Sequence, residues 1–210
     1  MPARLRPTAP IAADAILVGD PGRALMLAQE LLEQPKMSNH ARGLWGYTGV
    51  TATGDELTIQ ATGMGGPSAA VVVADLAELG VRRAIRVGTC ASLGDLELGD
   101  LLIVAEANGQ RPERDLTETL TAVLPGAHRG PVVSLDTLYR PERDMPSVLA
   151  EGADMQTAGL LASAAEHGVA AAAVLIVFEK SGAGQLPDEE LAEAAKRTGS
   201  TVATLFSTSG

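Results

Sequence analysis

The sequence predicts an α/β fold in which helices cover both faces of a largely parallel sheet. Short apolar segments alternate with segments of helical periodicity over most of the 210 residues. Aromatic residues make up only 2% of the chain, so Ala, Val and Leu must fill the core, which suits layered helices and sheets. No internal repeat or low-complexity linker is present, and we therefore expect one domain over residues 1–210.

The first half of the chain alternates strands and helices after an irregular arm, residues 1–12, which holds three prolines. Apolar runs that stop at glycine-rich turns predict strands, and apolar residues at helical spacing predict helices. Two apolar runs flank Thr53-Gly54-Asp55, which is typical of a hairpin. The expected strands are 13–18, 45–52, 56–61 and 83–87, and the expected helices are 23–34 and 68–79.

The second half continues the alternation. Pro187 opens the last helix, with Asp188, Glu189 and Glu190 in the first turn, where the helix dipole favours negative charge. The other expected elements are strands at 101–107, 131–135 and 171–178 and helices at 113–123 and 155–167.

Net charge excludes some partners. The chain carries 16 Lys and Arg against 26 Asp and Glu, a formal charge of −10. That balance argues against nucleic acid and against an anionic membrane surface. A small anion remains compatible if a few arginines converge.

Neither a disulfide nor a metal site is expected. Cys90 is the single cysteine, and no base is recognisable near it, so a small buried hydrophobe is favoured over a nucleophile. His40, His128 and His167 share no metal-ligand spacing. The sequence shows no leader-like segment and no apolar run of bilayer length, so we expect the cytoplasm.

Three glycine loops follow apolar strands, at residues 19–23, 63–68 and 88–92. In open α/β sheets, ligands sit beyond the carboxyl ends of strands. The loop at 19–23 either binds an anion through backbone N–H groups and Arg23, or is a plain turn in which Asp20 caps the helix. The loop at 63–66 is either a phosphate loop or a tight turn, since it lacks Walker spacing.

Arg86 interrupts an apolar strand, where a charge is costly unless it is paired. Together with Thr89, three residues on and past a glycine, it could clamp an oxyanion. The alternative is a structural salt bridge from the strand end.

Taken in order, these segments resemble the nucleoside phosphorylase family that contains uridine phosphorylase and hexameric purine nucleoside phosphorylase. The resemblance implies a three-layer αβα fold with a mixed, largely parallel twisted central sheet. Its motifs are Gly-Asp-Pro-x-Arg at 19–23, His-Ala-Arg-Gly at 40–43, Gly-Met-Gly-Gly-Pro-Ser at 63–68, Arg-Val-Gly-Thr at 86–89, Ser-Leu-Asp-Thr-Leu-Tyr at 134–139 and Asp-Met-Gln-Thr-Ala-Gly at 154–159.

The resemblance also implies a phosphate site and an assembly. The matching phosphate residues are Gly19, Arg23, Arg42, Arg86 and Thr89. Arg42 matches an arginine that reaches the phosphate of a neighbouring subunit, which implies a homo-oligomer, either a dimer or a trimer of dimers. Inorganic phosphate is then a co-substrate, and no other cofactor or metal is expected.

Sugar and base recognition depart from the family pattern. Met64, Asp154, Met155 and Gln156 match the ribose site, but Gln156 stands where the family has a glutamate. Leu138 and Arg143 match the base site. Glu179 stands where the purine enzymes have an aspartate, and we assign it, together with Arg86, to catalysis, provided that burial keeps Glu179 protonated.

These assignments predict phosphate-dependent cleavage of the N-glycosidic bond of a purine or pyrimidine nucleoside, giving free base and (deoxy)ribose 1-phosphate. The alternatives are a catalytically weak homologue that binds nucleoside and phosphate, and a nucleosidase. A nucleosidase does not need three arginines, so the sequence favours phosphorolysis.

Overall fold

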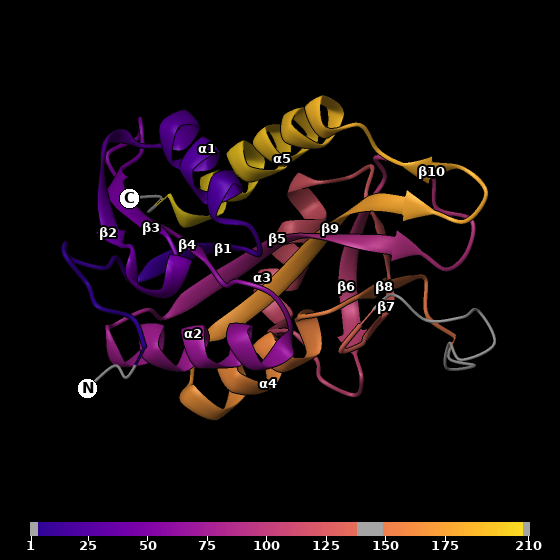
Figure 1. Cartoon of the computed structure of the whole chain (residues 1–210), viewed down its shortest axis with the longest axis horizontal. Helices are drawn as coiled ribbons and strands as arrows, with labels where there is room; N and C mark the ends of the chain where they lie inside the picture. Colours follow the sequence, from indigo (N-terminus) through magenta and orange to yellow (C-terminus); the bar gives the residue numbers. More distant parts are fainter. Residues whose placement is uncertain (1–3, 138–148, 208–210) are drawn as a thin grey trace.

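The computed structural model describes residues 4–137 and 149–207 (Figure 1). Its sheet has the strand order β10-β9-β6-β7-β8-β5-β1-β4-β3-β2. Pairing is parallel at the centre, where β1 lies between β4 and β5, and antiparallel between β2, β3 and β4 at one edge. The mixed sheet is therefore confirmed. The five strands of this half are β1 (Asp14–Val18), β2 (Glu33–Asn39), β3 (Gly46–Val50), β4 (Glu56–Ala61) and β5 (Arg83–Ser92). The strand at the opposite edge is β10 (Gly184–Gln185).

The second half of the sheet closes on itself. β9 (Ala170–Lys180) pairs with both β5 and β6 (Leu101–Ala107), and β7 (His128–Ser134) joins β6 to β8 (Gly152–Asp154). β8 then returns to pair with the end of β5. This closure brings the segment after β8 against the carboxyl half of β5.

Helices cover both faces of the sheet (Figure 1). α1 (Pro21–Leu31), α3 (Arg114–Val123) and α5 (Asp188–Ala203) share one core cluster, and α2 (Gly66–Glu78) and α4 (Thr157–His167) share the other. Alternate residues of β1 divide between the clusters, because side chains alternate along a strand: Leu17 belongs to the α2–α4 side and Ile16 to the α1–α5 side. Within the described part of the chain, no helix combines the length and apolar character needed to cross a bilayer.

The expected helices and strands are confirmed, with differences at four places. β5 continues through residues 88–92, expected as a loop, because β9 pairs with it as far as Ser92. The short strands β8 and β10 were not predicted. Neither was β2, an edge strand that contains Pro35, a residue tolerated at edges because it lacks an N–H.

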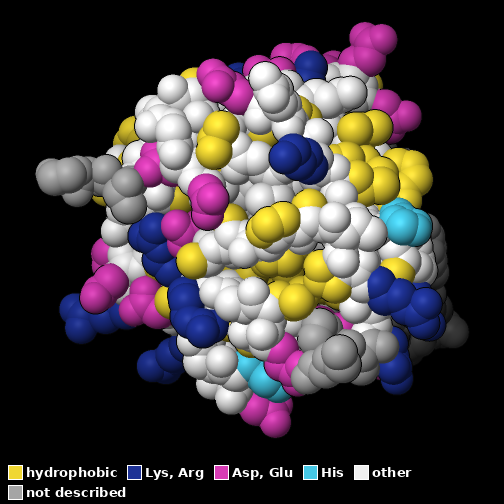
Figure 2. All heavy atoms as spheres, turned by 90° about the vertical axis from the view of Figure 1, so that its left-hand side faces the viewer, with side chains coloured by type: hydrophobic (Ala, Val, Ile, Leu, Met, Phe, Trp, Pro, Cys, Tyr) yellow, Lys and Arg dark blue, Asp and Glu magenta, His cyan; other side chains and the backbone are white. Residues whose placement is uncertain are grey.

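The edge formed by β2 and β3 carries exposed apolar side chains. Met37 and Val50 lie there with 41% and 37% of their surface exposed. Figure 2 looks onto this side of the molecule and shows apolar side chains gathered between groups of charged ones.

The proline-containing arm is held to the body. Asp75 Oδ2 accepts hydrogen bonds from the backbone N–H groups of Arg4 and Leu5, both at 2.7 Å. Leu5 is buried in the α2–α4 core cluster. The expected irregular arm is thus irregular in backbone but packed.

Candidate active site

A cavity of about 440 Å³ opens where the predicted loops meet. It joins the loop after β1, the loop after β4, the second half of β5 and the segment after β8. Its lining residues are Gly19, Asp20, Pro21, Arg23, Gly63, Met64, Gly65, Arg86, Gly88, Thr89, Asp154, Met155 and Gln156.

Three helices begin at this cavity. α1 starts at Pro21, α2 at Gly66 after the lining residue Gly65, and α4 at Thr157 after the lining residue Gln156. The first N–H groups of a helix have no partner within it, and its N-terminus carries a partial positive charge. Part of this capacity is used within the protein, because Asp20 accepts from the backbone N–H of Arg23 and Asp154 accepts from that of Thr157. The remaining N–H groups and the helix dipoles favour an anion in the cavity despite the net charge of −10.

Glycine is required in the loop before α2. Gly63 and Gly65 have φ of 74° and 85°, in the left-handed region that other residues rarely adopt. The turn directs the carbonyl of Gly63 toward α4 and leaves Met64 81% exposed at the cavity mouth. The tight turn thus also forms part of the cavity wall.

Arg23 lines the cavity, and its backbone and its guanidinium have different surroundings. Asp20 accepts a hydrogen bond from the backbone N–H of Arg23 at 2.7 Å and so caps α1, as the turn alternative predicted. Among the described residues, no hydrogen bond from the Arg23 guanidinium is formed. Burial lowers the pKa of Arg23, Asp20 raises it, and Arg86 lowers it further. An anion in the cavity would relieve this burial of unpaired charge.

Arg86 is 4% exposed and is held by three side chains. Its Nη2 lies 3.1 Å from Asp154 Oδ2, its Nη1 donates to Gln156 Oε1 at 2.8 Å, and its Nε donates to Thr157 Oγ1 at 3.1 Å. The salt-bridge alternative is thus present. Since a guanidinium has five N–H groups and three are used here, two are left for a ligand in the cavity that Arg86 lines.

Asp154 accepts hydrogen bonds from several neighbouring groups and connects them. It is 1% exposed, and its Oδ1 accepts from Ser134 Oγ at 2.5 Å. Its Oδ2 accepts from the backbone N–H and the hydroxyl of Thr157, at 3.0 and 2.5 Å. The carboxylate therefore starts α4 and orients Arg86, and little of it is left for a ligand.

Gln156 is also enclosed, with 5% of its surface exposed. Its Oε1 accepts from Arg86 and lies 3.0 Å from Thr62 Oγ1, while its Nε2 donates to the carbonyl of Gly63. It thus ties the Gly63 loop to Arg86. Met155 lines the cavity beside it.

Arg42 and Cys90 do not line the cavity. Arg42 is exposed in a short helical turn, Ala41–Gly43, and does not line the cavity. Leu138 and Arg143 lie outside the described residues. Cys90 is buried, and burial raises the pKa of its thiol to about 12, which fits the interpretation as a small hydrophobe.

Glu179 requires a correction. Its assignment as a general acid depended on burial, but the side chain is exposed and does not line the cavity. Its Oε2 accepts a hydrogen bond from Gln185 Nε2 at 3.3 Å, across the β9–β10 pair. The reason is that β9 extends two residues past Phe178 into a hairpin that carries Glu179 away from the core.

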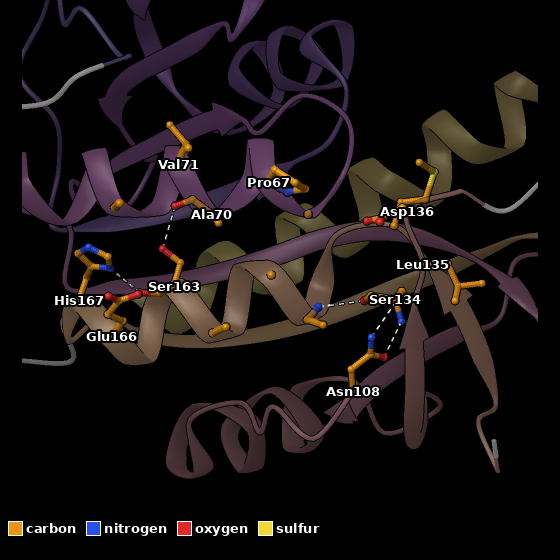
Figure 3. Close-up of a pocket in the computed structure, with 16 residues that line it drawn as sticks. Pro67, Ala70, Val71, Asn108, Ser134, Leu135, Asp136, Ser163, Glu166 and His167 are labelled. Atoms are coloured by element: carbon orange, nitrogen blue, oxygen red, sulfur yellow. Dashed lines mark hydrogen bonds between the residues drawn. The ribbon is translucent and has the colours of Figure 1, made fainter. Parts of the chain in front are cut away.

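A second cavity, of about 540 Å³, lies between α2 and α4 (Figure 3). Ser163 donates to the carbonyl of Ala70 across it at 2.8 Å, and His167 contacts the carbonyl of Ser163 at 2.8 Å. Its described lining contains no Arg or Lys. The arginine-lined cavity is therefore the candidate active site.

Comparison with known proteins agrees with this geometry. The family model described as "Phosphorylase superfamily" matches residues 14–208. The chain belongs to the phosphorylase superfamily. That match spans both helical layers and every segment that lines the cavity.

Relatives within the phosphorylase superfamily include purine nucleoside phosphorylases of the DeoD type. The protein of Caldanaerobacter subterraneus is 32% identical over 205 residues, covering 86% of this chain and 88% of that one. A Bacillus cereus protein is 34% identical over 194 residues, covering 80% and 82%. The crystal structure of purine nucleoside phosphorylase from Toxoplasma gondii in complex with immucillin-H has the same fold, with a TM-score of 0.82 at 21% identity, covering 93% of this chain and 90% of that one.

Sequence reasoning missed the groups that hold Arg86 and its partners. Thr62, Ser134 and Thr157 contact Gln156 or Asp154. For Thr157 a signal was present, because an aspartate three residues before a threonine at a helix start is a common capping arrangement. Thr62 offered no such signal, since its partner lies 94 residues away.

Proposed function

We propose that this protein is a nucleoside phosphorylase, which cleaves the N-glycosidic bond of a purine or pyrimidine nucleoside with inorganic phosphate. The observation that carries the proposal is the convergence of three helix N-termini and two arginines, Arg23 and Arg86, on one cavity. The assignment also agrees with the names of the relatives.

Phosphate occupies the arginine side of the cavity in this proposal. Arg23 supplies a guanidinium without an acceptor, Arg86 its two unused N–H groups, and Thr89 a hydroxyl. Gly19 allows the ligand to approach the backbone at the start of α1. Positioning of phosphate beneath C1′ of the sugar, rather than proton transfer, is the main contribution of these residues to catalysis.

The sugar lies next to the phosphate, against Met64, Met155 and Gln156. The buried Asp154 acts through Arg86 and α4 instead of contacting the sugar, because its oxygens already accept from Ser134, Thr157 and Arg86. Base recognition by Leu138 and Arg143 remains a prediction.

Arg42 completes the site of a second copy of the chain. It is exposed and lies between β2 and β3, at the edge whose apolar side chains are visible in Figure 2. A second copy that covers this edge would bury apolar surface and receive the guanidinium. The homo-oligomer, dimer or trimer of dimers, is thus part of the proposal, as is a cytoplasmic location.

A catalytically weak nucleoside-binding protein is the second candidate. The neutral Gln156 favours it, because an amide cannot stabilise the positive charge that builds on the sugar in the transition state. The exposed position of Glu179 favours it as well.

One assay separates these functions. The protein is incubated with a panel of purine and pyrimidine nucleosides, with and without inorganic phosphate, and free base and pentose 1-phosphate are quantified. A phosphorylase forms both products only with phosphate. Base release without phosphate would show a nucleosidase, and nucleoside binding without either product would show a binding protein. Arg23→Ala serves as the matched control, because phosphate-dependent turnover should fall with it.

A further inference from the structure

The hydrogen-bonding capacity of Gln156 is nearly exhausted within the protein. Of the two lone pairs on its Oε1, one accepts from Arg86 Nη1 at 2.8 Å and the other faces Thr62 Oγ1 at 3.0 Å. The single proton of Thr62 also has the carbonyl of Val18 within 3.0 Å. On Nε2, one N–H is donated to the carbonyl of Gly63, which leaves one N–H without an acceptor among the residues that the structure describes.

The partners determine which way the amide points. The Arg86 guanidinium can only donate and the Gly63 carbonyl can only accept, so the reversed amide would lose both bonds. Gly19 lies beside the amide, since a Cβ placed there would be 3.6 Å from Oε1 and 3.7 Å from Nε2. Gln156 therefore offers a ligand a hydrogen-bond donor and no acceptor.

This donor is the polar group that Gln156 itself offers to a sugar in the cavity. Among the described lining side chains, Arg23, Arg86 and Thr89 serve the phosphate and Asp154 is occupied, while Asp20 is exposed and uses only Oδ1 to cap α1. The other side chains near Gln156 are the thioethers Met64 and Met155. One N–H can satisfy one sugar hydroxyl, but not two.

We propose that Gln156 determines sugar specificity and makes the site selective for 2′-deoxynucleosides over ribonucleosides. A second, vicinal hydroxyl would lose water without gaining a partner, and an unsatisfied polar group is costly. This inference rests on the proposed nucleoside phosphorylase function. It requires the neutral amide, since a glutamate at this position would place a carboxylate oxygen against the Gly63 carbonyl while offering acceptors to the diol.

The test compares a 2′-deoxynucleoside with the ribonucleoside of the same base, at saturating phosphate, in the full-length protein. We expect wild type to favour the deoxynucleoside by at least about 5-fold in kcat/KM, mainly through KM. In Gln156→Glu this ratio should shrink or reverse. Gln29→Glu, which adds the same charge at an exposed position on α1 outside the cavity, should leave the ratio unchanged.

Several outcomes would overturn the inference. The first is a wild-type kcat/KM that is equal for the two nucleosides or higher for the ribonucleoside. The second is a ratio of the two kcat/KM values that does not change in Gln156→Glu. If Gln156→Glu does not fold, Thr62→Val provides the second variant, because it frees one acceptor direction on Oε1 and should lower the deoxy preference.

The failure of the proposed function is distinguishable from the failure of this inference. If neither nucleoside is turned over, the phosphorylase proposal fails, and the same pair is measured by calorimetry. Tighter binding of the deoxynucleoside, lost in Gln156→Glu, still supports the inference; equal binding, tighter ribonucleoside binding or no binding overturns it.

Discussion

Arg86 and Asp154 form a buried ion pair at the centre of the site, with Nη2 and Oδ2 3.1 Å apart and side chains that are 5% and 1% exposed. Arg86 comes from the middle of β5 and Asp154 from the end of β8. The pair thus joins β5 to the start of α4. Its two charges depend on each other, because either one alone would be buried without compensation.

Removal of one partner should destabilise the fold. Arg86→Ala should lower the free energy of unfolding by roughly 3–5 kcal/mol, because it leaves the Asp154 carboxylate buried and unpaired. The control is Arg129→Ala, which breaks the Arg129–Glu118 pair, where the side chains are 40% and 55% exposed and the contact is 3.2 Å. That pair should contribute only about 1 kcal/mol or less. Urea unfolding measures both, and equal losses would contradict the role given to the buried pair.

Substitution of Arg23 tests phosphate binding without breaking the buried Arg86–Asp154 pair. Arg23→Ala should weaken phosphate binding about 10- to 150-fold, because a charge-assisted hydrogen bond is lost, while the melting temperature should not fall. Arg129→Ala, which removes a guanidinium from a surface pair with Glu118, should leave phosphate affinity unchanged. Calorimetric titration with phosphate decides the point, and an unaltered dissociation constant in Arg23→Ala would refute the assignment.

Arg42 offers a test of shared sites. Arg42→Ala and Arg23→Ala should each be nearly inactive alone. After the two variants are unfolded together and refolded, mixed dimers should regain activity, because one of their two sites then receives an intact Arg23 and the partner's intact Arg42. Refolding of each variant alone is the control. No recovery in mixtures shown by light scattering to be oligomeric would place Arg42 outside the site.

Glu179 should be dispensable. Because the side chain is exposed and contacts Gln185 rather than the cavity, Glu179→Gln should change kcat by no more than about 2-fold. The pH profile of kcat should also keep its shape. A loss of kcat of about 100-fold or more, the contribution typical of a general acid, would restore the catalytic assignment.

Cys90 should make stability depend on alkaline pH. Its pKa is about 12 in the folded protein against 9.0 for the free side chain, so the folded state holds the proton more tightly. This contribution is fully present below pH 9 and is lost as the pH rises to about 12, at up to about 1.4 kcal/mol per pH unit. Urea unfolding at pH 8 and pH 10.5 should show a smaller decrease for Cys90→Ala than for wild type. Parallel decreases would contradict the shift.

Much of the architecture was predictable because it depends on local patterns. Apolar runs ending in glycine turns located β1, β4 and β5, and Thr53-Gly54-Asp55 located the β3–β4 hairpin, whereas the edge strand β2 was missed. The closure from β5 through β9 and back to β8 was not predictable, because a three-residue strand such as Gly152–Asp154 carries almost no pattern.

The residues of the site also fall into two groups, those that a local sequence pattern indicates and those that only long-range contacts bring together. Glycines and arginines that border the cavity have local signatures, and the sequence identified them. The bond from Gln156 to Gly63 joins residues 93 positions apart, so no spacing indicates it. For Arg86, the sequence left a salt bridge and an oxyanion clamp as alternatives; in the structure Arg86 forms the salt bridge and also lines the cavity.

The backbone of Arg42 has a consequence for protein engineering. With φ of 60° and ψ of 19°, this residue occupies the left-handed region, where glycine is favoured by about 1–2 kcal/mol. A library selected only for heat resistance would therefore drift toward Arg42→Gly and discard the guanidinium. Thermostabilisation of this protein is thus best coupled to a screen for turnover, because the substitution that relaxes the turn is also the one that removes its charge.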